Sequence, residues 1–167
     1  MEKTDLTVLV VEDDEAIQTM YSLSLKKRFT NVLIARDGLE GWELFLREKN
    51  AGRVIPVVVT DAMMPRMDGP ELMSNILKVS PATQIIIISG YYKSSISIHS
   101  ARENVMYLPK PLDVMLLNIA VMKAFSHYPQ ALWLERLKAE VQDPYFNEEA
   151  VLAIVREAPW LRSEDQS

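Results

Sequence analysis

Six polar residues of the sequence stand at or just after the ends of short apolar runs: Glu12, Asp13, Asp14, Asp61, Ser89 and Lys110. Carboxylates gathered at one place repel each other unless a cation joins them. Oxygen ligands without a neighbouring histidine or cysteine favour a hard cation, Mg²⁺ or Mn²⁺. A lysine and a hydroxyl nearby would complete a pocket for a phosphoryl group. The residue types therefore predict phosphoryl transfer, in which positioning and charge neutralisation supply most of the catalysis.

These residues can meet only if the apolar runs form neighbouring strands. The runs are rich in branched apolar residues and are mostly continuous: 6–11, 31–35, 54–60, 83–89 and 105–108. Continuous runs are typical of parallel strands buried on both faces, and helical periodicity lies between most of them. The pattern predicts an α/β fold: a flavodoxin-like doubly wound five-stranded parallel sheet, in the order 2-1-3-4-5, with helices on both faces. Its ligand site is expected at the carboxyl ends of the strands.

Two segments fit this pattern less simply. Residues 92–98 are rich in serine and β-branched residues, which favours a short fourth helix at best. The helix starting at Leu112 is apolar nearly all round, so it should be buried on more than one side. We expect a first domain at 1–128, a two-helix extension at 129–162 and a polar tail at 163–167. The extension, a second copy of the chain, or both would cover the exposed side of the helix.

Composition limits the possible functions. The net charge of −5 and an acidic extension argue against direct nucleic-acid binding. No apolar run approaches the roughly 20 residues that a membrane helix needs, and no signal peptide is visible. The absence of cysteine excludes disulfides and fits a cytoplasmic protein. We therefore expect no nucleic-acid or membrane partner.

Each polar residue has a simpler interpretation when taken alone. Asp13 or Asp14 could merely cap a helix, Asp61 could be a turn residue, and Lys110 could lie in a solvated loop. The functional interpretation depends on the joint pattern, because several strand ends must carry the right residue types in the right order.

In that joint pattern the sequence resembles the receiver domains of two-component response regulators. The resemblance rests on four motifs, spread over about three quarters of the chain: Val10-Val11-Glu12-Asp13-Asp14, Asp61-Ala62-Met63-Met64-Pro65 with Asp68-Gly69, Ser89-Gly90 and Lys110-Pro111. It implies that Asp61 accepts a phosphoryl group from a sensor histidine kinase or a phosphotransfer protein. The chain would then be a switch that assists its own phosphorylation and dephosphorylation, rather than an enzyme, and would signal to a downstream protein target.

The resemblance also implies individual roles. Asp13 would be a direct ligand of Mg²⁺ (or Mn²⁺), Glu12 would hold the cation through water, and Asp61 and the backbone carbonyl of Met63 would complete the set. Ser89 would donate to a phosphoryl oxygen and act in the switch. Lys110 would pair with the carboxylate or phosphoryl group, with a cis bond before Pro111. Tyr107 occupies the family's aromatic switch position, although a half-buried aromatic residue on an edge strand is an equally good interpretation.

Two other functions fit the sequence less well. A flavodoxin would carry a phosphate loop rich in serine, threonine and glycine where three acids stand here, and an aspartyl phosphatase would carry a second aspartate at the position of Met63. A degenerate receiver that binds proteins without phosphorylation stays open as the alternative. The extension is short and acidic, so we expect a stand-alone receiver that acts by protein contact. A homodimer through the fifth helix and the extension is one candidate for that contact.

Overall fold

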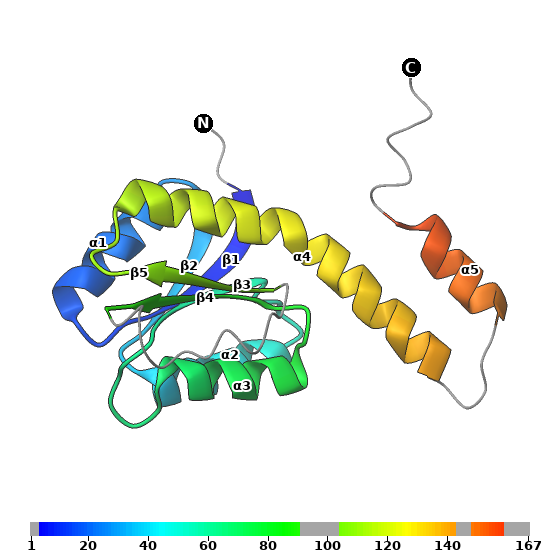
Figure 1. Cartoon of the computed structure of the whole chain (residues 1–167), viewed down its shortest axis with the longest axis horizontal. Coiled ribbons are helices and arrows are strands. Elements are labelled where there is room, and N and C mark those ends of the chain that lie inside the picture. Colours follow the sequence, from blue (N-terminus) through cyan, green and yellow to red (C-terminus); the bar gives the residue numbers. More distant parts are fainter. Residues whose placement is uncertain (1–3, 91–103, 143–147, 159–167) are drawn as a thin grey trace, which may run out of the picture.

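The computed structural model places a parallel sheet between two layers of helices (Figure 1). It describes residues 4–90, 104–142 and 148–158. Within this part the sheet has five strands in the order β2-β1-β3-β4-β5, and each neighbouring pair is parallel. The predicted doubly wound, flavodoxin-like fold is therefore confirmed.

The elements alternate along the chain until the fourth strand. They are β1 (Thr4–Val11), α1 (Glu15–Leu25), β2 (Phe29–Ala35), α2 (Gly38–Asn50), β3 (Val57–Asp61), α3 (Gly69–Val79), β4 (Gln84–Ser89), β5 (Val105–Pro109), α4 (Val114–Gln142) and α5 (Glu148–Arg156). The strand limits agree with the apolar runs to within a few residues. β3 begins after Pro56, whose ring nitrogen has no hydrogen to donate to a ladder. The short helix predicted at 92–98 lies outside the described residues.

Successive residues of the central strands enter two separate cores, because side chains alternate between the faces of a strand. On one face Val57 and Val59 pack with α1 and α4, and on the other Val58 packs with α2 and α3. Every residue of β3 and β4 is buried, which explains why these runs are continuous in the sequence. Figure 1 shows the same division, with α1 and α4 on one side of the sheet and α2 and α3 on the other.

Helix α4 differs from the sequence prediction. It runs as one helix through Pro129, where a boundary between the first domain and the extension was expected. A proline inside a helix removes one backbone hydrogen bond and bends the axis, and good helix-forming residues on either side let the helix continue. The axis of α4 changes direction about half-way along its length in Figure 1. The division of the chain at residue 128 stays a prediction, although no helix ends there.

Helix α5 folds back onto the second half of α4. The indole N–H of Trp133 donates to the carbonyl of Ile154 at 2.7 Å, and Arg136 pairs with Glu157 at 2.9 Å. Ile154 and Ala158 are buried, at 8% and 0% exposure. The predicted polar tail at 163–167 lies outside the described residues.

The first part of α4 is not covered as expected. One side packs on the sheet through Leu117, Val121 and Phe125. On the other side four apolar side chains are between 42% and 71% exposed: Met115, Leu116, Ile119 and Met122. Of the expected arrangements, cover by the extension within one chain is not seen among the described residues, because the extension prolongs the axis of α4 instead of lying beside this face. Cover by a second copy of the chain stays a prediction. No helix in the described ranges is long and apolar enough to cross a membrane.

One contact attaches the second half of α4 to the sheet layer. The carboxylate of Glu135 accepts a hydrogen bond of 3.0 Å from the backbone N–H of Ala82, just before β4. Ala82 is 2% exposed. A buried N–H without a partner is costly, so this carboxylate stabilises the turn that leads into β4.

Replacement of Glu135 by alanine should therefore lower the free energy of unfolding by about 1–2 kcal/mol, because the N–H of Ala82 loses its acceptor. Urea denaturation of the full chain measures the change. Glu140→Ala is the matched control, since it removes the same side chain from the same helix, and it should change stability by less than about 0.5 kcal/mol. Equal losses in the two variants would show that the contact contributes nothing specific.

Candidate functional site

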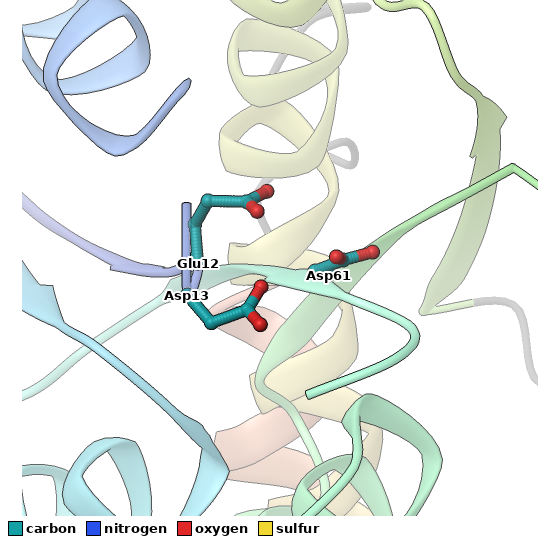
Figure 2. A group of neighbouring side chains, drawn as sticks. All are labelled: Glu12, Asp13 and Asp61. Carbon is teal, nitrogen blue, oxygen red and sulfur yellow. The ribbon is translucent and has the colours of Figure 1, made fainter. Parts of the chain in front are cut away.

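Three carboxylates converge at the carboxyl ends of β1 and β3. Carboxylate oxygens of Glu12, Asp13 and Asp61 all lie within 4.8 Å of one another (Figure 2). Glu12 and Asp61 are buried, at 2% and 7% exposure, whereas Asp13 is exposed. β1 and β3 are neighbours in the sheet, with Val11 opposite Thr60, so residues that follow their ends must meet. The site therefore has two buried carboxylates, Glu12 and Asp61, and one carboxylate exposed to solvent, Asp13.

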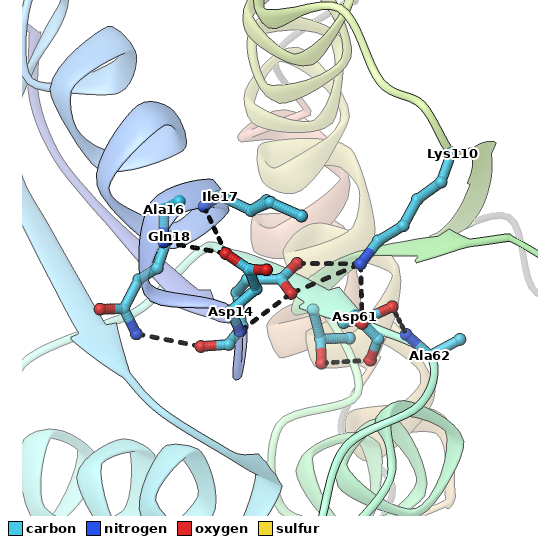
Figure 3. A network of polar contacts seen from close by, with 9 residues as sticks. Asp14, Ala16, Ile17, Gln18, Asp61, Ala62 and Lys110 are labelled. Atoms are coloured by element: carbon cyan, nitrogen blue, oxygen red, sulfur yellow. Dashed lines mark hydrogen bonds and ion pairs between the residues drawn. The ribbon is translucent and has the colours of Figure 1, made fainter.

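Lys110 supplies the positive charge inside this group. Its ammonium lies 2.8 Å from Oδ2 of Asp61 and 3.3 and 3.4 Å from the two oxygens of Glu12 (Figure 3). The residue follows β5, and its backbone N–H donates to the carbonyl of Ser89 at 2.9 Å. The peptide bond between Lys110 and Pro111 is cis, as the resemblance implied. Lys110 thus joins the ends of three strands, β1, β3 and β4.

The charges at the site are only partly balanced. Burial and the negative charge of Asp61 raise the pKa of Glu12, and the ammonium of Lys110 offsets only part of this. Burial also lowers the pKa of Lys110, but the hydrogen bond to Asp61 and the charge of Glu12 outweigh it, so the pKa lies above its usual value. Three carboxylates beside one ammonium leave an excess of negative charge. That excess and the all-oxygen donor set fit a hard divalent cation such as Mg²⁺ or Mn²⁺.

The backbone around Asp61 is held closely. The N–H of Ala62 donates to Oδ1 of Asp61 at 2.7 Å and lies 2.8 Å from the carbonyl of Ile88, so it is shared between the two acceptors. A β-carbon on Gly69 would lie 2.2 Å from the carbonyl oxygen of Asp61. Only glycine therefore lets the start of α3 pack against the end of β3. Both oxygens of the Asp61 carboxylate have a donor, one from the backbone and one from Lys110.

The loop after Asp61 is anchored to the neighbouring helix. Arg66, with a φ of 66°, donates to the carboxylate of Asp37 at the start of α2, at 2.8 Å from Nε. Gly38 is required beside this contact, because a β-carbon there would lie 2.2 Å from the carbonyl oxygen of Met67. This ion pair cannot be predicted from the sequence, since residues 29 apart in the chain carry no local signal of contact.

The remaining predicted site residues lie around the three acids. Asp14 caps α1 and accepts hydrogen bonds from the N–H groups of Ala16 and Ile17 at 2.9 and 3.0 Å. Of the two aspartates that could have capped this helix, Asp13 and Asp14, it is Asp14 that does so. Ser89 is buried at the end of β4, at 4% exposure. The side chain of Met63 is 71% exposed on the loop after β3. Tyr107 lies partly buried in the edge strand β5, and burial raises its pKa.

Sequence reasoning also missed Gln18. Its side-chain amide donates to the backbone carbonyls of Glu12 and Ala35, each at 3.0 Å. A glutamine one turn into an amphipathic helix is ordinarily a solvated residue, so nothing in the sequence marks it.

The comparisons with known proteins agree with this geometry. The family model described as the response regulator receiver domain matches residues 8–122. The sensor kinase CckA of Brucella abortus is 33% identical over 116 residues, which are 69% of this chain and 12% of that kinase. The chain therefore spans only a small part of this curated relative.

Solved structures match over more of their length. A response regulator receiver domain protein from Clostridium thermocellum is 30% identical, with a TM-score of 0.64, over 72% of this chain and 94% of that one. A chain of the CheX–CheY–BeF3–Mg²⁺ complex from Borrelia burgdorferi is 27% identical, with a TM-score of 0.62, over 72% and 89%. The family match covers more than half of the chain, including the strand ends that carry the acids and the lysine. The protein belongs to the response regulator receiver domain family of two-component signalling.

Proposed function

We propose that the protein is a phospho-acceptor switch, in which Asp61 takes a phosphoryl group from a phosphohistidine of a sensor histidine kinase or a phosphotransfer protein. The observation that carries the proposal is the 2.8 Å contact between Lys110 and Asp61 inside a group of three carboxylates. One carboxylate oxygen of Asp61 forms a bond to phosphorus while the phosphorus–nitrogen bond breaks, and the electron pair returns to the imidazole. Asp61 is the natural acceptor because its carboxylate makes the shortest contact with Lys110, at 2.8 Å against 3.3 and 3.4 Å for Glu12.

The chain's own residues have distinct tasks in this reaction. The ammonium of Lys110 and the N–H of Ala62 orient the carboxylate of Asp61 before transfer. After transfer Lys110 can pair with a phosphoryl oxygen, and Ser89 supplies a hydroxyl from the neighbouring strand. Pre-arranged donors of this kind are effective because they need no reorganisation during the reaction. Tyr107, in β5, is the residue whose packing would report the change to partner proteins.

The acid group would hold Mg²⁺ or Mn²⁺. Asp13 and Asp61 would be direct ligands together with the backbone carbonyl of Met63, and Glu12 would act through water. When bound, the cation neutralises charge on the transferred phosphoryl group. The matched Borrelia complex contains BeF3 and Mg²⁺, which supports this choice of cofactor.

The output is proposed to be a change in protein–protein contacts, with the downstream target and a second copy of this chain as candidate partners. The four exposed apolar side chains of α4 form the surface we assign to a homodimer. Contiguous apolar surface of this kind is unusual on a monomer. A degenerate receiver would need neither the lysine nor the acid group, so no feature of the site favours that alternative.

Acetyl phosphate with Mg²⁺ should add one acid-labile phosphoryl group to the protein, and mass spectrometry should locate it on Asp61. Asp61→Asn should abolish the modification, because an amide is a poor nucleophile toward phosphorus. Asp68→Asn, which changes the exposed aspartate that caps α3, is the matched control and should still be labelled. Labelling of Asp61→Asn at the wild-type level would refute the assignment.

The two acids after Glu12 should differ in their effect on the cation. Asp13→Asn should weaken Mg²⁺ binding by about 10-fold or more, since it removes a charged ligand. Asp14→Asn should change binding much less, because asparagine also caps helices well. Isothermal titration calorimetry measures both affinities, and equal effects would show that the ligand is misassigned.

Ile119→Lys should shift the protein from dimer to monomer, because it places a charge in the centre of the proposed interface. Val54→Lys is the matched control, since Val54 is exposed to a similar extent, 57% against 55%, but lies before β3. Multi-angle light scattering of the phosphorylated and unphosphorylated proteins gives the mass directly. A wild-type protein that is monomeric in both states would rule out the dimer.

A further inference from the structure

The side chain of Gln18 lies between the ends of two strands, directly beside the acid group. It is on α1, and its amide nitrogen donates to the carbonyl of Glu12 at the end of β1, a bond that Figure 3 shows. The same nitrogen also donates to the carbonyl of Ala35 at the end of β2. A side-chain amide carries two N–H donors. Both carbonyls lie at 3.0 Å, so one nitrogen bridges the two strands.

The bridge lies where the β1–β2 ladder ends. The last paired residues are Val11 and Ala35, and the N–H of Glu12 makes one further bond to the carbonyl of Ala35 at 3.2 Å. Beyond this point the two strands diverge, since β1 leads into α1 and β2 leads into α2. Gln18 continues the pairing by one step, because it provides the carbonyl of Glu12 with a donor.

This contact fixes the backbone that carries both acids of β1. Glu12 is held through its N–H by Ala35 and through its carbonyl by Gln18. On the other side, Asp14 is fixed as the cap of α1. Asp13 lies between these two anchored residues, so the direction of its exposed carboxylate follows from their positions.

We infer that Gln18 is a positioning residue for the cation site, an inference that rests on the proposed function. Its amide donates to backbone carbonyls and not to the carboxylates, and it holds the peptide between Glu12 and Asp13 in the orientation that brings their carboxylates to Asp61. Residues that orient metal ligands typically change metal affinity by 10–100-fold when they are replaced. A site of this kind tolerates displacements of only about 0.5 Å.

Gln18→Met tests the inference, because methionine has a similar length and no donor. The dissociation constant for Mg²⁺, measured by calorimetry on the full chain, should rise about 10-fold. The rate of phosphorylation by acetyl phosphate should fall at limiting Mg²⁺ and recover at saturating Mg²⁺. A purely structural role would instead reduce the active fraction at every Mg²⁺ concentration.

A second variant and a control separate positioning from loss of stability. Gln18→Asn keeps the amide but is one carbon too short to reach both carbonyls, so it should weaken Mg²⁺ binding in the same direction. Leu25→Val perturbs the core side of the same helix, where Leu25 is 0% exposed, and should lower the melting temperature without changing the affinity for Mg²⁺.

The outcomes distinguish this inference from the proposed function. Wild-type protein that binds Mg²⁺ and is phosphorylated, together with a folded Gln18 variant whose affinity is within twofold of the wild-type value, would overturn the role of Gln18 alone. An equal loss of affinity in Leu25→Val would overturn it as well, because the effect would then be general destabilisation. Wild-type protein that binds no Mg²⁺ would overturn both the cation site and this inference.

Discussion

The constraint on which the rest of this structure depends is the concentration of negative charge at the ends of β1 and β3. Two of the three carboxylates are almost completely buried, where an unpaired charge is costly, and Lys110 is the cation that lies among them. Parallel strands bring these residues together because all their carboxyl ends lie at one edge. The fold thus holds like charges close to one another, and the remaining excess of negative charge favours the binding of a cation.

Such a site requires a rigid backbone around it, and several parts of the fold supply this rigidity. The fully buried strands β3 and β4 fix the positions of Asp61 and Ser89, and the two cores prevent either strand from sliding. Close backbone approaches at Gly38 and Gly69 then set the loop after Asp61 against α2 and α3. Each of these features depends on a residue type that is visible in the sequence, although the contacts themselves join distant segments.

The sequence was most informative where burial alone decides the structure. Continuous apolar runs such as Ile85–Ile88 predict central strands, and the polar residues that follow them predict where the site lies. It was least informative where two local signals oppose each other, as at Pro129, where the cost of one lost hydrogen bond was less than the gain from continuing a helix. The bridge made by Gln18 could not be predicted, because it depends on where two strands diverge in space.

The continuity of α4 has a mechanical consequence. The helix begins shortly after Lys110 and Pro111, and at 1.5 Å per residue its 29 residues span about 43 Å along an axis that bends about half-way. A flexible connection would absorb a small rearrangement at the pocket, whereas a continuous helix, attached to the sheet layer by Glu135, would pass it on. Because α5 packs on the half of α4 that is farther from Lys110, it is the described element to which such a rearrangement would be carried.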